Sequence, residues 1–138
     1  MIKYIIGDIK FIGEDYFILD SNGLGYKILS TSTSMIKLEI NKNYMIHTYM
    51  AVREDDISLY GFFDESEMEF FELLITVTSI GPKNALAILS SLDVNSIVKA
   101  INTNDINTLT KAKGVGKKTA SRIILELSDK VEKMHTED

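Results

Sequence analysis

Apolar and polar residues alternate in short blocks along the first 62 residues. Five apolar runs, separated by turn-forming sequences such as Gly-Glu-Asp at 13–15, cover residues 2–6, 16–19, 25–29, 44–52 and 58–62. The runs are rich in Tyr, Phe, Ile and Val and recur about every ten residues, which is typical of small all-β domains. The pattern predicts five strands in a compact barrel or sandwich, and an SH3-like barrel fits it equally well.

The pattern changes near residue 63, after which helix signals dominate. We expect helices at about 66–78, 82–91, 94–102, 105–110 and 117–131. Ser66 and Glu69 match a capping box, and Asp93 and Asn104 are expected to cap the third and fourth helices. The sequence therefore predicts an α+β protein, with a barrel domain at 1–62 and an all-α domain at 63–138.

The helical half contains an internal repeat at an offset of 35 residues. Residues 74–92 align with 109–127, and the most similar parts are Ser-Ile-Gly-Pro-Lys at 79–83 and Gly-Val-Gly-Lys-Lys at 114–118. Helical solenoids also have periods near 35, but two copies are too few for one and the helices are too short. The repeated unit is a helix, a tight turn and a helix that begins with lysine.

This repeated turn has the features of a phosphate receptor. Glycine permits a positive φ and a close approach of a ligand, and the helix that follows points its free N–H groups and its dipole at the turn. An aliphatic residue in each turn is placed to plug it between the helices, and lysines add positive charge. The candidate DNA-binding residues are Ile80, Gly81, Lys83, Gly114, Val115, Gly116, Lys117, Lys118 and Arg122. Such a receptor binds the DNA backbone and does not read bases.

The first copy departs from the second at Ser79, which stands where the second turn has Gly114. If this position needs a positive φ, the first turn is either strained or differently shaped. A single turn of this kind is also compatible with a plain connection between helices. Two copies in register favour DNA binding.

The charge distribution supports a local polyanion site in an acidic protein. The chain has 138 residues and a net charge of −5, but residues 80–130 carry 8 basic and 4 acidic groups, a net +4. The field of such a segment acts over about 8–10 Å in physiological salt, so the local charge matters more than the total. The acidic total therefore does not exclude DNA.

The order of these motifs resembles a known protein family. The paired turns resemble tandem helix-hairpin-helix motifs, and they follow Ala-Val-Arg-Glu-Asp at 51–55 and Leu-Tyr-Gly-Phe at 59–62. In this combination the chain resembles the RuvA family of bacterial Holliday-junction branch-migration proteins over nearly its whole length. The resemblance implies an OB-type barrel before the hairpins, and a four-way DNA junction as the ligand in homologous recombination and repair.

The resemblance also implies an assembly and an acidic element. Four copies would form a homotetramer, or two stacked tetramers, that holds the junction open. The acidic pin of the family corresponds to Glu54 and Asp55, with Asp56 beside them. Two carboxylates from each of four chains place at least eight negative charges near crowded phosphates, and like charges within about 8–10 Å repel. We expect this repulsion to disfavour the stacked junction and to guide the separating strands.

The family has a third domain that docks the hexameric ATPase RuvB, and we expect it to be absent from this chain. Lys113 also departs from the proline usual in the family. No Walker A sequence occurs, so we expect no intrinsic enzymatic activity. We expect the partner to hydrolyse ATP.

The sequence also predicts several absences and leaves two alternative functions open. We expect no cofactor and no metal, since Cys is absent and His47 and His135 are far apart, although the acids at 54–56 also suit magnesium or a plain solvated turn. Without a long apolar stretch, we expect no membrane segment and a cytoplasmic location. The alternatives are a structure-indifferent duplex-binding module of a repair enzyme and a DNA-free protein scaffold.

Overall fold

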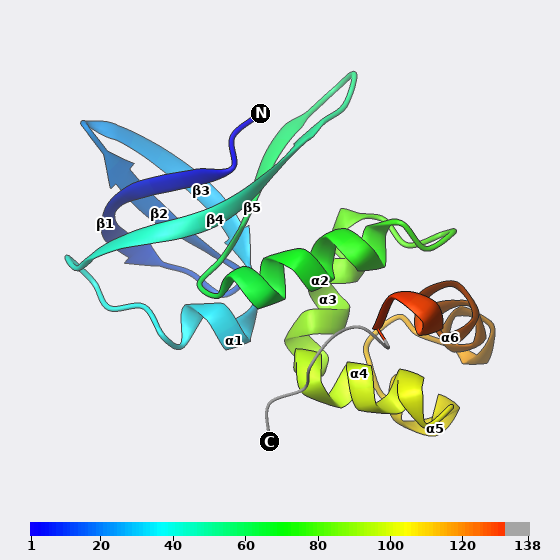
Figure 1. The fold of residues 1–138 in the computed structure, drawn as a ribbon. Coiled ribbons are helices and arrows are strands. Elements are labelled where there is room, and N and C mark those ends of the chain that lie inside the picture. Colours follow the sequence, from blue (N-terminus) through cyan, green and yellow to red (C-terminus); the bar gives the residue numbers. More distant parts are fainter. Residues whose placement is uncertain (132–138) are drawn as a thin grey trace. The chain divides into compact units, whose positions relative to one another are not determined.

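The first unit of the chain is a closed five-stranded barrel. The computed structural model describes residues 1–131, which divide into Met1–Met68 and a second unit from Glu69 onward (Figure 1). The strands are β1 (Tyr4–Ile12), β2 (Tyr16–Ser21), β3 (Leu24–Ser30), β4 (Asn43–Val52) and β5 (Ile57–Phe62). They bond in the order β1-β2-β3-β5-β4, and only the β3–β5 pair is parallel. The predicted OB-type barrel is confirmed.

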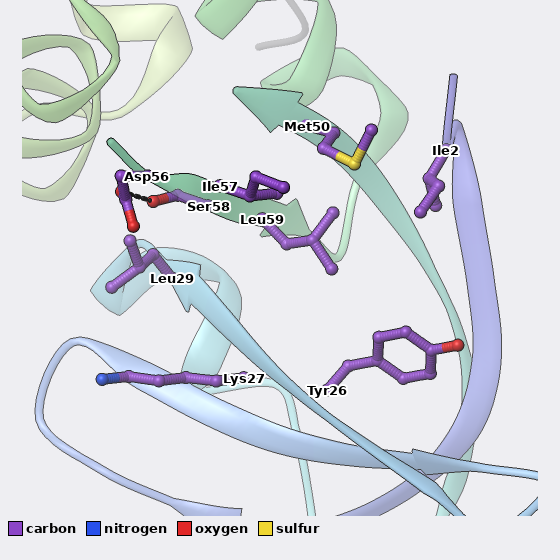
Figure 2. A pocket seen from close by; sticks show the side chains of 9 residues that line it. All are labelled: Ile2, Tyr26, Lys27, Leu29, Met50, Asp56, Ile57, Ser58 and Leu59. Atoms are coloured by element: carbon purple, nitrogen blue, oxygen red, sulfur yellow. Dashed lines mark hydrogen bonds between the residues drawn. The ribbon is translucent and has the colours of Figure 1, made fainter. Parts of the chain in front are cut away.

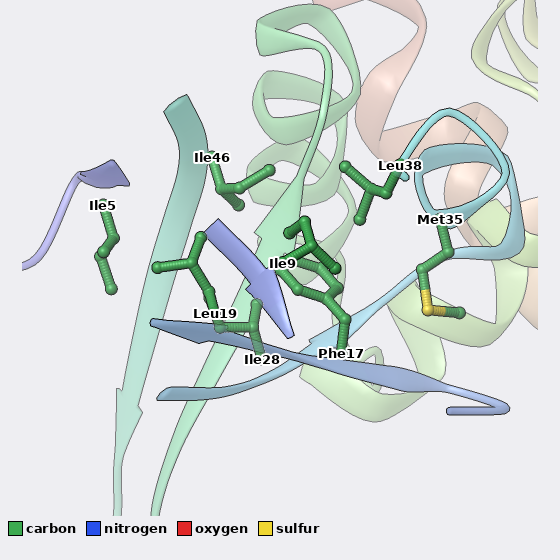
Figure 3. Packing of buried hydrophobic residues seen from close by; sticks show 8 residues of the cluster. All are labelled: Ile5, Ile9, Phe17, Leu19, Ile28, Met35, Leu38 and Ile46. Carbon is green, nitrogen blue, oxygen red and sulfur yellow. The ribbon is translucent and has the colours of Figure 1, made fainter. Parts of the chain in front are cut away.

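The barrel core follows from the alternation of the strands. Along the start of β1, Ile5 and Ile9 are buried while Tyr4 and Ile6 are exposed, because successive side chains point to opposite faces. The core cluster consists of Ile5, Ile9, Phe17, Leu19, Ile28, Met35, Leu38 and Ile46 (Figure 3). Each large apolar side chain that becomes fully buried contributes about 1.5–3 kcal/mol, so this cluster dominates the stability of the unit.

A short helix, α1 (Ser32–Met35), connects β3 to β4 and was not predicted. Its N-cap Thr31 accepts a hydrogen bond from the Ser34 N–H at 3.0 Å. Thr31 and Ser34 donate from their hydroxyls to Oε1 of Glu67, and the Thr31 bond is 2.8 Å long. Glu67 is only 5% exposed, and burial raises the pKa of its carboxyl despite these two bonds. This network joins α1 to the first turn of the helix that contains Glu67.

Within residues 1–131, five helices follow the barrel. They are α2 (Glu65–Ile75), α3 (Pro82–Ser91), α4 (Val94–Asn102), α5 (Ile106–Leu109) and α6 (Lys117–Val131). Asp93 caps α4 as predicted, by accepting from the Ser96 N–H at 2.7 Å. Asn104 does not cap α5: the cap is Asp105, which accepts from the Thr108 N–H, while Asn104 takes a positive φ of 58°. The capping box predicted at Ser66 and Glu69 is also wrong, because α2 begins at Glu65 and Ser66 therefore lies inside the helix.

The helices of the second unit share a core in which α4 packs against α5 and α6. Its apolar residues recur three or four positions apart, as in Ile97 and Ile101 on α4 and Ile123 and Leu127 on α6, and all four are buried. Among residues 1–131, no single helix is long and apolar enough to cross a membrane; α3 and α4 pass that test only as a pair bent by 94°.

Candidate nucleic-acid interface

The two hairpins have the same backbone hydrogen bonds, displaced by 35 residues. In the first turn the Ile80 N–H donates to the Val77 carbonyl at 3.0 Å, and the Ala85 N–H donates to that of Gly81 at 2.9 Å. The second turn repeats both bonds, from Val115 to Ala112 at 3.1 Å and from Ala120 to Gly116 at 2.9 Å. The sequence repeat is therefore a structural repeat of one turn.

Ile80 and Val115 anchor the two turns in the helical core. Their side chains are 5% and 6% exposed, although Ser79, Gly114 and Gly116 beside them are exposed and Gly81 is half-buried. An aliphatic side chain here removes apolar surface from water and fixes the turn relative to the helices that flank it. Neither side chain is placed to contact DNA, so these two candidates present a ligand with backbone groups alone.

Ser79 adopts the left-handed conformation that Gly114 adopts in the second turn. The φ angles are +73° and +82°, and Ser79 is one of few non-glycine residues in this region. The Ser79 hydroxyl donates to the carbonyl of Thr78. The first turn is therefore strained and not reshaped, at a cost of about 1–2 kcal/mol for a side chain in the left-handed region.

Gly81 and Gly116 have a different reason to lack a side chain. Gly81 has φ −96° and ψ 178°, an extended conformation open to any residue. A Cβ atom built on Gly81 or Gly116 would meet no heavy atom within 4 Å. The fold itself therefore does not require glycine at either position, and the missing side chains leave open space directly before the first turns of α3 and α6.

The helix starts that face this space are not capped by a side chain. Gly81 is the N-cap of α3, with Pro82 in the first turn, and α6 begins directly after Gly116. The N–H groups of a helix's first turn have no partner within the helix, and the helix dipole makes this end positive. An anion such as a phosphate oxygen fits both requirements.

The candidate cations lie next to these helix starts. Lys83, Lys117 and Lys118 are exposed, and Arg122 is half-buried one turn further along α6. Within residues 1–131, the ion pairs are Lys37–Asp64 and Lys42–Glu39, so none of these four cations is neutralised by a carboxylate there. Their charge is available to a polyanion.

Glu54 and Asp55 lie in the turn between β4 and β5. The hairpin formed by these two strands extends beyond the rest of the barrel (Figure 1), and its turn is closed by a 2.8 Å bond from the Arg53 N–H to the Asp56 carbonyl. Asp56 accepts from the Ser58 hydroxyl at 2.6 Å, whereas in the described part of the chain Glu54 and Asp55 have no bonded partner. Two of the three carboxylates are thus free to act on a ligand.

Two further features of this hairpin were not predicted. Val52 and Ile57 are direct cross-strand partners below the turn and are 58% and 67% exposed. Beside them an open pocket of about 430 Å³ is lined mainly by apolar residues, including Tyr26, Leu29 and Leu59 (Figure 2). The pocket joins β3, β4, β5 and the N-terminal segment, so no local motif could have revealed it.

The structure gives no support for a metal at the acidic turn. Across residues 1–131, no group of three His, Asp or Glu side chains is arranged to hold a metal ion. His47 lies on β4, and His135 falls outside the described residues.

A closed five-stranded barrel with an acidic hairpin, joined to two glycine turns before lysine-bearing helices, defines an OB-barrel protein with a tandem helix-hairpin-helix unit. Comparison with family models agrees: residues 1–61 match the RuvA N terminal domain, and residues 71–129 match the SAM-like helix-hairpin-helix tandem.

Three curated relatives cover 96% of the chain: those of Acetivibrio thermocellus, Caldanaerobacter subterraneus and Finegoldia magna are 46%, 48% and 50% identical to it. Each is named Holliday junction branch migration complex subunit RuvA. The chain spans 66%, 72% and 67% of their respective lengths. The chain belongs to the RuvA family.

Proposed function

We propose that this protein binds four-way DNA junctions and holds them open for branch migration during homologous recombination and DNA repair. The observation that carries the proposal is the paired phosphate receptor: two hairpins with the same bonds, open space before α3 and α6, and lysines that no carboxylate neutralises among the described residues. The names of the relatives supply the ligand, because each is a subunit of a Holliday junction branch migration complex.

In this function the two hairpins bind the phosphate backbone of the junction arms. Backbone N–H groups of a helix start, together with lysine, contact phosphates without reading sequence, and a branch point must be bound wherever it moves. Gly81 and Gly116 permit the approach, and Lys83, Lys117, Lys118 and Arg122 neutralise phosphate charge. The receptor is therefore suited to a ligand defined by its shape.

Glu54 and Asp55 act in the opposite sense. Their unpaired carboxylates at the end of a projecting hairpin repel phosphates within a Debye length of about 8–10 Å. We propose that four copies of the chain form a homotetramer that gathers these hairpins at the crossover. There the carboxylates disfavour the stacked junction and guide strands from one duplex to the next.

The chain has no assigned catalytic step in this proposal. Exchanging one base pair for an identical one is nearly balanced in free energy, so directed migration needs an external motor. We propose that this motor is the partner ATPase RuvB, and that the complex works in the cytoplasm, where bacterial chromosomal DNA lies.

A second candidate function is a duplex-binding module that is indifferent to branching. The backbone-only chemistry of the hairpins favours it as much as it favours junctions. A competition gel shift separates the two functions. If the protein prefers junctions, unlabelled four-way junction displaces labelled junction at a much lower concentration than unlabelled linear duplex of the same total length does. Equal displacement by both competitors supports the second function and contradicts the first.

A further inference from the structure

Each hairpin turn is hydrogen-bonded to the second helix of the other hairpin. The Thr78 N–H, in the first turn, donates to Oε1 of Glu126 on α6 at 3.2 Å. The Lys113 N–H, in the second turn, donates to Oγ of Ser91 on α3 at 3.2 Å. Residues 78 and 113 are 35 positions apart, as are 91 and 126. The same contact is thus made twice, once in each direction.

The two acceptors are oriented for this contact by their other bonds. The Ser91 hydroxyl donates to the Ala87 carbonyl at 2.9 Å, which leaves its lone pairs for the Lys113 N–H. The Thr78 hydroxyl also donates to Oε1 of Glu126 at 3.4 Å, so one carboxylate oxygen accepts from both hydrogen-bond donors of that residue. Both donors come directly before the left-handed residue of their turn, where the chain reverses.

The charge of Glu126 makes its position informative. Residues 80–130 carry a net +4, and a carboxylate among them weakens attraction to a polyanion. Its bond to the Thr78 N–H gives a reason for a carboxylate at this position, because a hydrogen bond to a charged acceptor is stronger than one to a neutral acceptor. Ser91 accepts the equivalent hydrogen bond from the second turn and carries no charge.

We propose that Ser91 and Glu126 are positioning residues that hold the two phosphate-binding turns in one fixed arrangement, so that both engage a single duplex arm together. This inference rests on the proposed function for its ligand. When the two turns are held rigidly, the second turn binds within the complex that the first has already made. Its binding free energy then adds to the total binding free energy. When the turns move independently, much of that gain is lost.

The test compares Glu126→Ala with Asp129→Ala in the full chain. Both variants remove one acid from α6, and Asp129 is exposed and makes no bond within the described residues. Affinity for a labelled four-way junction is measured across a series of salt concentrations. If Glu126 acts only as a charge, both variants bind more tightly than the wild type. If it positions the turn, E126A binds about tenfold more weakly while D129A does not.

The salt dependence separates positioning from simple loss of folded protein. The slope of log K against log salt is about −0.9 for each phosphate neutralised. We expect E126A to show a shallower slope, because fewer phosphates are contacted at once. A variant that merely folds less well keeps the wild-type slope, and that result would overturn the inference.

Two other variants and one DNA-free measurement complete the design. Glu126→Gln keeps an oxygen acceptor and loses only the negative charge, so it is expected to bind at least as tightly as the wild type does. Ser91→Ala removes the other contact at an exposed helix position, where alanine favours the helix, so it remains informative if E126A fails to fold. Amide hydrogen exchange should accelerate at Thr78 in E126A and at Lys113 in S91A, and at neither in D129A.

The outcomes distinguish this inference from the function on which it rests. If the wild type fails to bind junctions, the proposed function falls and the inference falls with it. If the wild type binds, but E126A and S91A keep its slope and its amide protection, the inference alone is overturned.

Discussion

Ser79 and Gly114 hold the same left-handed backbone conformation at equivalent positions of two hairpins, with φ of +73° and +82°. Glycine takes this conformation freely, whereas serine is strained by its Cβ atom. The two turns nevertheless form matching hydrogen bonds. Their shape is therefore imposed by the packing of Ile80 and Val115 as much as by the residue at the bend.

Replacing Ser79 with glycine should stabilise the protein. Relief of the left-handed strain gains about 1–2 kcal/mol, and the extra freedom of glycine in the unfolded chain costs about 0.5–1 kcal/mol. We expect a net gain of about 0.5–1 kcal/mol in the free energy of unfolding, measured by urea denaturation. The reverse change, Gly114→Ser, should be destabilising. A Ser79→Gly variant less stable than the wild type would contradict the strain.

Gly81→Ala and Gly116→Ala should weaken DNA binding with little effect on the fold. A Cβ atom meets nothing in the free protein at either site, and the loss of glycine at the helix start costs at most about 1 kcal/mol. In the complex the methyl group stands between a phosphate and the helix N–H groups. We expect about tenfold weaker junction binding for each variant, equivalent to about 1.4 kcal/mol, by fluorescence anisotropy.

Gly114→Ala is the matched control for this effect. A Cβ atom at residue 114 would also meet no heavy atom within 4 Å, but the φ of +82° strains any side chain there. The Gly114→Ala variant should therefore lose more stability than Gly116→Ala. Unchanged affinity in both Gly81→Ala and Gly116→Ala would show that phosphate does not approach these turns.

Neutralising the acidic turn should tighten junction binding while impairing branch migration. The double variant Glu54→Gln, Asp55→Asn removes the repulsion of phosphates, so we expect several-fold tighter junction binding in 0.1 M salt and unchanged affinity for linear duplex. At 1 M salt, where the Debye length is about 3 Å, the difference should vanish. Asp56→Asn serves as the comparison, because that carboxylate is bonded to Ser58 within the hairpin.

Migration itself is measured with the double variant in an otherwise intact branch-migration system. Slower migration together with tighter junction binding supports guidance by the acids. If neither the affinity nor the migration rate changes, Glu54 and Asp55 are only a solvated turn.

The buried carboxyl of Glu67 should make the stability of the protein fall with rising pH. Burial raises its pKa above the ordinary glutamate value of 4.5, although the hydroxyls of Ser34 and Thr31 oppose the shift. The folded state then binds more protons than the unfolded state between 4.5 and the raised pKa, so the free energy of unfolding decreases as the pH rises through this window. Nearby Asp64 strengthens the shift and Lys37 weakens it.

Comparing Glu67→Gln with Glu65→Gln tests this prediction. Both residues lie in the first turn of α2, but Glu65 is exposed. Urea denaturation at several pH values should show the descending slope in the wild type and in E65Q, and its loss in E67Q. The same slope in all three proteins would contradict the role assigned to Glu67.

Local sequence signals predicted most of the fold, because the elements carry their own periodicity and caps. The five strands were identified from short apolar runs separated by turn sequences, and Asp93 was identified from its position before an apolar helix. The short helix α1 was missed because its sequence, Ser-Thr-Ser-Met, has too few residues for a helical pattern. The cap of α5 was placed one residue too early, at Asn104, because a cap and a left-handed residue before it favour similar side chains.

The sequence predicted the part of the candidate site whose residues are neighbours in the chain. The hairpin residues follow one another in the chain, and their repeat makes them visible. The bonds from Thr78 to Glu126 and from Lys113 to Ser91 span 48 and 22 residues and depend on packing. Even so, the spacing of 35 residues between Ser91 and Glu126 is a signal in the sequence that points to this pairing.

The central claim is that two backbone-binding hairpins serve a branched ligand. The most direct measurement is the ratio of the affinities of the wild-type chain for a four-way junction and for a linear duplex of the same length, determined at 0.15 M salt. This account predicts a preference for the junction of at least about tenfold, or about 1.4 kcal/mol. Equal affinities for the two DNAs would contradict it.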